Sequence, residues 1–559
     1  MVGTRSAHRS FLPWFALAIG AGLWLRLDQF AAQLLLEDEW HAVYRVVHDA
    51  PAAIFLDFAH SDSSIPLTLL YALESRTFGL SEIGMRLPLL LAGAATLILF
   101  PWYVARHVGR GEALVFAALL AISPLLYFFS RTARPYALTL LLAWIAHVAF
   151  RRFFEAQASR SADAAGYGVS ATLAAWLHPV VGPFVVAPFV TAAWQCARRG
   201  PGAERRRGIA RLAVLALAAA LPMAALLLPP LVAHPESLRL KSGVDLPDGD
   251  TLIGVWYVWF GTGATAALLI CGALALLGVP AVWRKLPEAR SAVAGIALTV
   301  LAVVITRPAW IHNPLTFGRY LLPILPLLLL ATACGAVRAG RALRAALLVR
   351  GSGASVAGAL GALAAALPVL LLALTSPLRP LLQYPNANSL HSLYGFDFRP
   401  EHNPVSRLMD GIPLSAWWER LGDRPPGSLA IAVAPFPTET VGWDAPRWQR
   451  LSRQRIQHGF LTPLCANPRP TEVPDDGRFR FRNAVHLNDD AELARHRIDF
   501  VVWQKPYRYL AHGLDVAVGA DVAHCGPALS ARFGTPAYED EWLAVYRPPA
   551  LRGGRDAAR

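Results

Sequence analysis

Apolar runs separated by short polar segments dominate the first 376 residues of this chain. Several of these runs approach the roughly 20 residues that a helix needs to cross the apolar core of a bilayer. We therefore predict a polytopic α-helical membrane region with about eleven spans, of which the fifth is short. The predicted spans are 11–29, 84–104, 112–129, 135–153, 167–177, 180–196, 209–232, 254–283, 291–306, 320–337 and 354–376.

The loops between the apolar runs alternate in charge. One set is rich in arginine, as in 198–208 (RRGPGAERRRG), whereas the other set has few basic residues and holds most of the acids before residue 378. Arginine-rich loops stay in the cytoplasm, so we expect a cytoplasmic N-terminus and an external C-terminal part. These loops account for the net charge of +14, which argues against nucleic-acid binding. The first run lacks a clear cleavage site and is expected to be an uncleaved signal anchor.

The first external loop, 30–83, is too long for a simple turn. Its segments 37–48 (EDEWHAVYRVVH) and 65–79 (IPLTLLYALESRTFG) show helical periodicity with one polar and one apolar side. This pattern is typical of helices that lie on the membrane surface. We therefore predict two interfacial helices in this loop.

The pattern changes after about residue 378, where no further segment is apolar enough to span a membrane. We divide the chain into a membrane domain (1–376), a linker (377–400), a small external α/β domain (401–550) and a tail (551–559). The predicted strands are 428–436, 478–485, 499–504 and 541–547, and the predicted helices are near 404–421, 445–458 and 488–497. Cys465 and Cys525 can form a disulfide if this domain lies outside the cytoplasm.

Two adjacent acids, Asp38 and Glu39, follow the first apolar run. A carboxylate at this place can begin a helix, bind a cation, or act as a general base for a hydroxyl that attacks a sugar. The neighbouring Trp40 and His41 can stack on a sugar and hydrogen-bond to it, or they can anchor the chain at the interface.

External arginines precede two of the later spans. Arg131 and Arg134 lie beside Pro135, which is well placed at the start of the next helix. Helix N-termini and guanidinium groups both favour anions, so a bound phosphate is one interpretation, and snorkelling to lipid headgroups is the other. Arg319 repeats the arrangement before the span at 320–337.

A histidine before a proline, His178, marks another external break and has either a structural role or a role in the site. The sequence contains no Walker A, GxGxxG, HExxH or CxxC motif, which gives no support to nucleotide or structural-zinc binding.

The acidic pair at 38–39, together with 60–73 (HSDSSIPLTLLYAL), 130–138 (SRTARPYAL) and 318–326 (GRYLLPILP), resembles the GT-C superfamily of integral membrane glycosyltransferases. The branch that it resembles includes bacterial enzymes similar to protein O-mannosyltransferases and the lipid A aminoarabinose transferase. The resemblance implies a GT-C-like fold over residues 1 to about 376. One departure is HSDSSIP, where the family often has His-Pro-Pro, and it leaves the acceptor class open.

The resemblance implies an inverting glycosyltransferase of the bacterial inner membrane. It would move a sugar from a polyprenyl-phosphate donor to a periplasmic acceptor, which could be a glycolipid, a polysaccharide or a protein. Asp38 and Glu39 are the expected catalytic residues. The expected substrate-binding residues are Arg131, Arg134, Tyr136, His178, Arg319, Tyr320, Trp40, His41 and His60. No cofactor and no metal site are predicted, although some relatives use a divalent metal.

Two other functions stay open at this point. A transporter or flippase of a lipid-linked saccharide predicts charged residues buried inside spans. A non-catalytic scaffold of the cell envelope would have no use for the external arginines.

Overall fold

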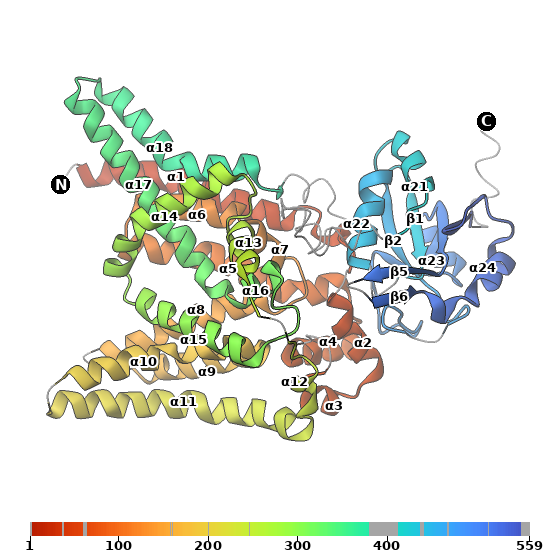
Figure 1. Ribbon diagram of the computed structural model, residues 1–559, viewed down its shortest axis with the longest axis horizontal. Helices are drawn as coiled ribbons and strands as arrows, with labels where there is room; N and C mark the ends of the chain where they lie inside the picture. Colours follow the sequence, from red (N-terminus) through yellow and green to blue (C-terminus); the bar gives the residue numbers. More distant parts are fainter. Residues whose placement is uncertain are drawn as a thin grey trace.

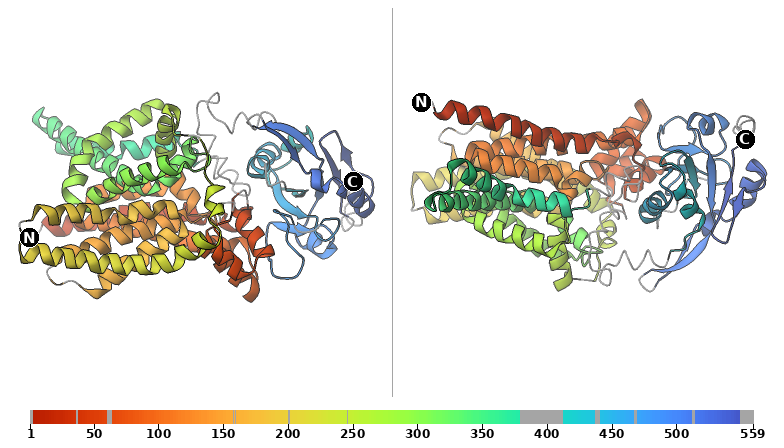
Figure 2. Two further views of the ribbon diagram at one scale, coloured as in Figure 1. Left: turned by 60° about the horizontal axis from the view of Figure 1, so that its bottom comes forward. Right: turned by 90° about the horizontal axis from the view of Figure 1, so that it is seen from above.

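The computed structural model describes residues 3–35, 38–59, 64–156, 158, 160–199, 201–244, 246–378, 412–436, 441–466, 469–511 and 514–548. A bundle of long helices forms one part, and an α/β domain lies at one end of it (Figure 1). Short helices of the first external loop lie at that same end, between the bundle and the α/β domain (Figure 2).

The regular secondary structure in the described part of the membrane region is helical. Its helices of twelve residues or more are α1 (Gly3–Leu27), α4 (Ile65–Thr77), α5 (Glu82–His107), α6 (Arg110–Ile122), α8 (Tyr136–Glu155), α9 (Ser161–Leu177), α10 (Gly182–Arg198), α11 (Ala203–Ala233), α13 (Gly249–Phe260), α14 (Thr265–Lys285), α15 (Glu288–Thr306), α17 (Leu325–Val349) and α18 (Ala354–Thr375). The shorter ones are η1 (Phe30–Ala32), α2 (Glu39–His48), α3 (Pro51–Leu56), α7 (Pro124–Phe129), η2 (Pro179–Val181), α12 (Glu236–Arg239), α16 (Pro314–Tyr320) and η3 (Leu322–Ile324).

Each predicted span falls on one to three of these helices. Eight helical segments of the described chain are long and apolar enough to cross a membrane, namely those at 82–107, 136–155, 179–198, 203–233, 265–285, 288–306, 322–349 and 354–375. The predicted spans 11–29, 112–129 and 167–177 also lie on helices, and the count of eleven crossings stays a prediction.

Two predicted spans are interrupted, in both cases by local backbone chemistry. The predicted span 112–129 breaks between α6 and α7, where Ser123 precedes Pro124 and adopts an extended conformation. A residue before proline is disfavoured in the helical region, which explains the break. The predicted span 254–283 divides into α13 and α14 because α13 ends at Gly261, which has a φ of 64°.

Small residues let the long helices approach one another closely. A Cβ atom added to Gly278 of α14 would collide with the backbone of Ala331 and Gly335 on α17. In the same way, Gly340 of α17 faces the carbonyl oxygen of Gly361 on α18. Such contacts are typical of helix pairs in membranes, where van der Waals packing replaces the hydrophobic effect as the main attraction.

The C-terminal domain contains a six-stranded sheet in the order β3-β2-β1-β4-β8-β7 and a β5–β6 hairpin. β1 to β4 run parallel, and β8 is antiparallel to β4 and β7. The strands are β1 (Ala430–Ala434), β2 (Arg455–Phe460), β3 (Ala484–His486), β4 (Phe500–Gln504), β5 (Tyr507–Ala511), β6 (Leu514–Val518), β7 (Tyr538–Glu539) and β8 (Leu543–Tyr546). The helices are α21 (Trp417–Arg420), η5 (Leu421–Asp423), α22 (Val441–Ser452), α23 (Asp490–Arg495), η6 (Ala520–Val522) and α24 (Cys525–Phe533).

The predicted α/β character of this domain is confirmed, but two predicted elements are wrong. The predicted helix 445–458 ends at Ser452, and β2 follows it. The predicted strand 478–485 is a strand only from Ala484, because its earlier residues bond to the membrane region instead. Part of the predicted helix 404–421 and most of the predicted linker lie outside the described residues. Cys465 and Cys525 form a disulfide.

The two parts of the chain share one buried interface. The backbone N–H groups of Arg482 and Asn483 donate to the carboxylate of Glu82 at the start of α5, at 2.9–3.0 Å. The amide of Asn483 also donates to the carbonyl oxygen of Ala31, at 3.0 Å. The C-terminal domain is therefore attached directly to the first external loop.

Candidate active site

A single carboxylate, that of Asp38, faces two arginines from distant loops. Its Oδ2 lies 3.1 Å from Nη2 of Arg134 and 3.6 Å from Nη1 of Arg319. Its Oδ1 lies 3.6 Å from Nε2 of His41. The side chain of Asp38 is 29% exposed, whereas that of Arg134 is only 3% exposed. The arginines thus form the buried wall of a site that the carboxylate reaches from the more open side.

Asp38 does not cap the helix that it precedes. Among the described residues, its side chain accepts no capping hydrogen bond from α2. Burial alone would raise its pKa, but Arg134, the hydrogen bond with His41 and then Arg319 outweigh burial and hold the pKa of Asp38 well below its ordinary value. The carboxylate is therefore ionised, and the pairing with arginine, rather than helix capping, explains its position.

Aromatic rings complete this centre. The guanidinium carbons of Arg134 and Arg319 lie 5.9 and 5.7 Å from the centre of the Tyr136 ring. The ring of His178 lies 5.3 Å from that of Tyr136 and 5.6 Å from that of Tyr320. Cations at such distances over aromatic faces are held by the ring quadrupole, which fixes the guanidinium planes.

The local backbone explains why these side chains meet. Arg134 lies in the turn that leads to Pro135 and the start of α8, and Arg319 lies near the end of the short helix α16. His178 follows the end of α9 in an extended conformation before Pro179. A proline thus marks a helix boundary at two of these places: Pro135 precedes α8, and Pro179 follows the end of α9.

Glu39 lies one residue from Asp38 but has different partners. Its carboxylate is 1% exposed and accepts hydrogen bonds from Nε and Nη2 of Arg86, at 2.8 and 2.7 Å. It also accepts one from the backbone N–H of Ala133, at 2.8 Å. Glu39 therefore ties α2 to α5 and to the loop that carries Arg134, and its predicted catalytic role stays a prediction.

Arg131 and Trp40 also lie outside the centre around Asp38. The guanidinium group of Arg131 is buried and donates to the carbonyl oxygen of Leu25 at 3.1 Å and to the hydroxyl of Tyr127 at 2.7 Å. The indole N–H of Trp40 donates to the carbonyl oxygen of Leu35 at 2.9 Å, and its ring packs on the C-terminal domain. The structure gives both residues a role in packing.

His60 lies outside the described residues, as do Glu37 and Asp62. Among the described residues, no group of three His, Cys, Asp or Glu side chains is placed to hold a metal ion.

Arg86 is a residue of this region that the sequence analysis did not single out. Its side chain is fully buried and also donates to the carbonyl oxygen of Gln33 at 2.7 Å. The sequence does contain a signal for Arg86, which lies inside the predicted span 84–104. An ionisable residue inside an apolar run needs a partner in the membrane region.

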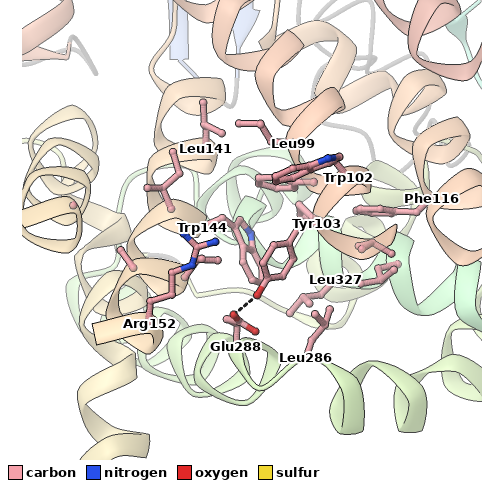
Figure 3. Close-up of a pocket in the computed structure, with 18 of the residues that line it drawn as sticks. Leu99, Trp102, Tyr103, Phe116, Leu141, Trp144, Arg152, Leu286, Glu288 and Leu327 are labelled. Carbon is pink, nitrogen blue, oxygen red and sulfur yellow. Dashed lines mark hydrogen bonds between the residues drawn. The ribbon is translucent and has the colours of Figure 1, made fainter. Parts of the chain in front are cut away.

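A cavity of about 360 Å³ lies further along α8, between α5, α6, α9 and α17. Figure 3 shows its aromatic wall, with Trp102 and Trp144, and its polar end, where the hydroxyl of Tyr103 donates to the carboxylate of Glu288. Its lining is mainly apolar.

The fold and the site together define a polytopic membrane protein whose Asp–Arg centre is adjacent to a C-terminal α/β domain. No protein-family model and no curated protein sequence matches the chain. Among solved structures, it is similar to ArnT from Cupriavidus metallidurans in the apo state, with 12% identity, a TM-score of 0.43, and coverage of 97% of this chain and 98% of that chain.

Two further structures are similar. ArnT from Cupriavidus metallidurans bound to undecaprenyl phosphate gives 12% identity, a TM-score of 0.41, and coverage of 90% of this chain and 98% of that chain. The oligosaccharyltransferase of Archaeoglobus fulgidus gives 12% identity, a TM-score of 0.40, and coverage of 88% and 69%.

Proposed function

We propose that this protein is an inverting glycosyltransferase that moves a sugar from a polyprenyl-phosphate donor to an acceptor outside the cytoplasm. The observation that carries the proposal is the sharing of one partly exposed carboxylate, Asp38, by two more deeply buried arginines. A buried and a half-buried guanidinium group at a membrane surface would form a site for a phosphodiester. A carboxylate beside them can accept the proton of an attacking hydroxyl.

Asp38 and the donor phosphate would compete for the same two arginines. A phosphate bound to Arg134 and Arg319 would displace the carboxylate from its ion pairs. The pKa of Asp38 would then rise from its depressed value, because its cationic partners would be neutralised by another anion. In this way donor binding itself would turn an inert carboxylate into a usable base.

The donor tail has a path within the helix bundle. α8 begins at Tyr136 beside the arginines, and Leu141, the first residue of α8 that lines the apolar cavity, lies about 8 Å further along at 1.5 Å per residue. Residues up to Arg152 on the same helix continue the lining. The prenyl chain would run along α8 from the phosphate site into this cavity.

The reaction needs no other reactant. The acceptor oxygen forms a bond to the anomeric carbon while the bond from that carbon to the phosphate oxygen breaks, with inversion. The acceptor proton moves to the carboxylate of Asp38, and the polyprenyl phosphate leaves as an anion that Arg134 and Arg319 stabilise. Glu39 would act as a positioning residue that holds α2 and the Arg134 loop in register.

We also propose that the C-terminal domain faces the periplasm of a bacterial inner membrane. The Cys465–Cys525 disulfide supports an oxidising compartment for this domain. The arginine-rich loops would then lie in the cytoplasm.

The test is turnover and binding on the purified protein with a panel of polyprenyl-phosphate sugars. We expect the wild type to bind at least one donor and to release polyprenyl phosphate when a glycan acceptor is added. Binding without release, combined with movement of the intact donor between leaflets of a proteoliposome, would replace the transferase proposal by a flippase. Failure to bind any lipid-linked sugar would overturn both.

A further inference from the structure

A groove of about 850 Å³ crosses the C-terminal domain on the side of β3. Its walls carry many more positive than negative groups. Five arginines line it, Arg455, Arg480, Arg482, Arg495 and Arg497, against two carboxylates, Asp475 and Glu492. A groove of this volume has room for a ligand larger than a single ion, such as a short oligosaccharide.

Most of this positive charge is available to a ligand. Glu492 is engaged within the domain, since its Oε1 accepts from Arg495 at 3.0 Å and its Oε2 lies 3.3 Å from Nδ1 of His486. Within the described parts of the chain, the side chains of the other four arginines form no ion pair. Exposed guanidinium groups gathered in one groove attract anions and bind phosphate or carboxylate groups in a bidentate manner.

One wall of the groove is fixed to the membrane region. The backbone of Arg478 and Arg480 exchanges hydrogen bonds with Leu80, at 2.8 and 2.7 Å. The side chain of Arg480 lies against Gly79, where an added Cβ would approach its Cδ to 2.8 Å. Gly79 has a φ of 90°, so a larger residue there would be strained as well as crowded. The position of the groove relative to the membrane region is therefore defined.

The floor of the groove contacts the helix that begins beside the candidate catalytic carboxylate. Phe460 and Phe481 line the groove, and their rings pack edge-on against Trp40, with centroids 6.2 and 5.8 Å away. Trp40 lies two residues after Asp38 in the chain. A molecule held in the groove would thus lie one aromatic side chain away from the N-terminal turn of α2.

The adjacent sheet edge does not offer a site for an added peptide strand. β3 is the edge strand, and the N–H of His486 that would face a new strand donates instead to Oε2 of Glu492, at 2.8 Å. Pairing by backbone hydrogen bonds is therefore blocked at this position. Recognition in the groove must come from its guanidinium groups and its Phe rings.

We propose that this groove binds the glycan portion of the acceptor, and that this glycan is anionic, carrying phosphate or carboxylate groups. The proposal rests on the proposed transferase function, because it is the transferase that requires an acceptor near Asp38. Guanidinium groups would pair with the acidic substituents of the sugar, and the half-buried rings of Phe479 and Phe481 would stack on the apolar faces of the sugar rings. The groove would orient the free end of the acceptor toward the membrane surface.

The experiment measures binding of fluorescent tetragalacturonate to the full-length protein in detergent, with uncharged maltotetraose as the neutral probe. The test variant is Arg455→Gln/Arg482→Gln/Arg497→Gln. The matched control is Arg424→Gln/Arg450→Gln/Arg508→Gln, which removes the same charge from arginines of this domain that do not line the groove. We expect the test variant to weaken tetragalacturonate binding at least tenfold and the control to stay within twofold of the wild type.

Three outcomes would overturn the proposal. Equal weakening in both triple variants would mean that only the overall charge matters. Stronger competition by a polyglutamate peptide of equal charge than by unlabelled tetragalacturonate would assign the groove to acidic proteins. Loss of tetragalacturonate binding in phosphatidylglycerol nanodiscs, but not in phosphatidylcholine nanodiscs, would assign it to lipid headgroups.

The result is separable from the proposed function, because binding needs no turnover. Asp38→Asn should bind tetragalacturonate like the wild type even though it transfers no sugar. If the protein binds tetragalacturonate but no lipid-linked sugar, the proposal for the groove stands and the proposal of a transferase fails. If the wild type turns over the donor and the test variant binds tetragalacturonate normally, the proposal of a transferase stands and the proposal for the groove fails.

Discussion

Nη2 of Arg134 lies 3.1 Å from Oδ2 of Asp38, although the two residues are 96 positions apart in the sequence, from 38 to 134. An ion pair between a buried guanidinium and a partly exposed carboxylate leaves one side of the carboxylate open to a ligand. In the proposed reaction, the donor phosphate takes the place of this carboxylate at Arg134 and Arg319, and the next two predictions test that exchange.

Asp38→Asn should separate binding from turnover. Removing the competing negative charge should tighten binding of polyprenyl phosphate to Arg134 and Arg319, whereas loss of the proton acceptor should lower turnover by roughly 10²- to 10⁴-fold. Equilibrium binding of the lipid and single-turnover kinetics would measure the two effects. Glu419→Gln, an exposed substitution in the C-terminal domain, is the control and should change neither. Weaker lipid binding in Asp38→Asn would contradict the exchange.

Arg134→Gln and Arg319→Gln should each weaken donor binding. Hydrogen bonds to charged groups contribute about 1.5–3 kcal/mol, which corresponds to a roughly 10- to 150-fold loss in affinity. Arg134 should be the more sensitive position, because its side chain is 3% exposed and that of Arg319 is 12% exposed. Titration with polyprenyl phosphate would measure the losses, and Arg350→Gln, at the exposed end of α17, serves as the control. Unchanged affinity in both variants would remove the phosphate from this site.

Glu39→Gln should act on stability before it acts on chemistry. Breaking a buried ion pair by removing one charge leaves Arg86 uncompensated and costs about 3–5 kcal/mol. We expect a lower thermal unfolding temperature in detergent and a poor yield of folded protein. The double variant Glu39→Met/Arg86→Met should recover part of the loss, since it leaves no unpaired charge. A fully stable but inactive Glu39→Gln would instead indicate a direct catalytic role.

Cys465→Ser/Cys525→Ser should destabilise the C-terminal domain by about 2–4 kcal/mol, because the disulfide closes a segment with a sequence separation of 60. Urea unfolding monitored by tryptophan fluorescence would measure the change. Labelling of intact cells with a membrane-impermeant maleimide after mild reduction should modify Cys465, which is half-buried, whereas Cys525 is fully buried. Labelling that requires cell lysis would place this domain in the cytoplasm.

Burial raises the pKa of Glu472 to about 7, despite hydrogen bonds from the N–H groups of Thr462 and Leu461. The folded state therefore holds a proton that the unfolded state releases between about pH 4.5 and 7. This carboxyl should lower stability as the pH rises through that window, by up to about 3 kcal/mol.

His458 has the opposite effect, because burial lowers its pKa and acid then favours unfolding. Comparing Glu472→Gln with the wild type between pH 5 and pH 8 isolates the contribution of Glu472. The variant should lose less stability toward alkaline pH than the wild type. Parallel pH profiles for the two proteins would contradict the assignment.

The sequence located the external acids and arginines but could not assign their partners. The sequence predicts Asp38, Arg134 and Arg319 on one membrane face, and in the structure both guanidinium groups lie within 4 Å of the Asp38 carboxylate. The sequence pattern alone could not show that Glu39 and Asp38 have different partners. Adjacent residues at a helix start point in directions about 100° apart, and what each one meets depends on α5 and α8.

The same limit explains the two wrong elements in the C-terminal domain. Residues 478–482 alternate between arginine and phenylalanine in a strand-like manner, yet their backbone groups bond to Glu82 and Leu80. β2 continues directly from α22 across a turn at Arg453, which has a φ of 60°. Such contacts and turns arise from tertiary packing, which overrides local propensity.

The attachment at Glu82 has a consequence for how the chain can be divided. Removing the C-terminal domain would take three hydrogen-bond donors away from this buried carboxylate, namely the N–H of Arg482 and the N–H and side-chain amide of Asn483, and would expose the ring of Trp40 to water. Glu82 lies four residues before Arg86, the partner of Glu39, so the disturbance would begin one helical turn from the candidate centre. The membrane helices alone would therefore not amount to a smaller working version of this protein. The membrane region and the C-terminal domain would fold and function only as one unit.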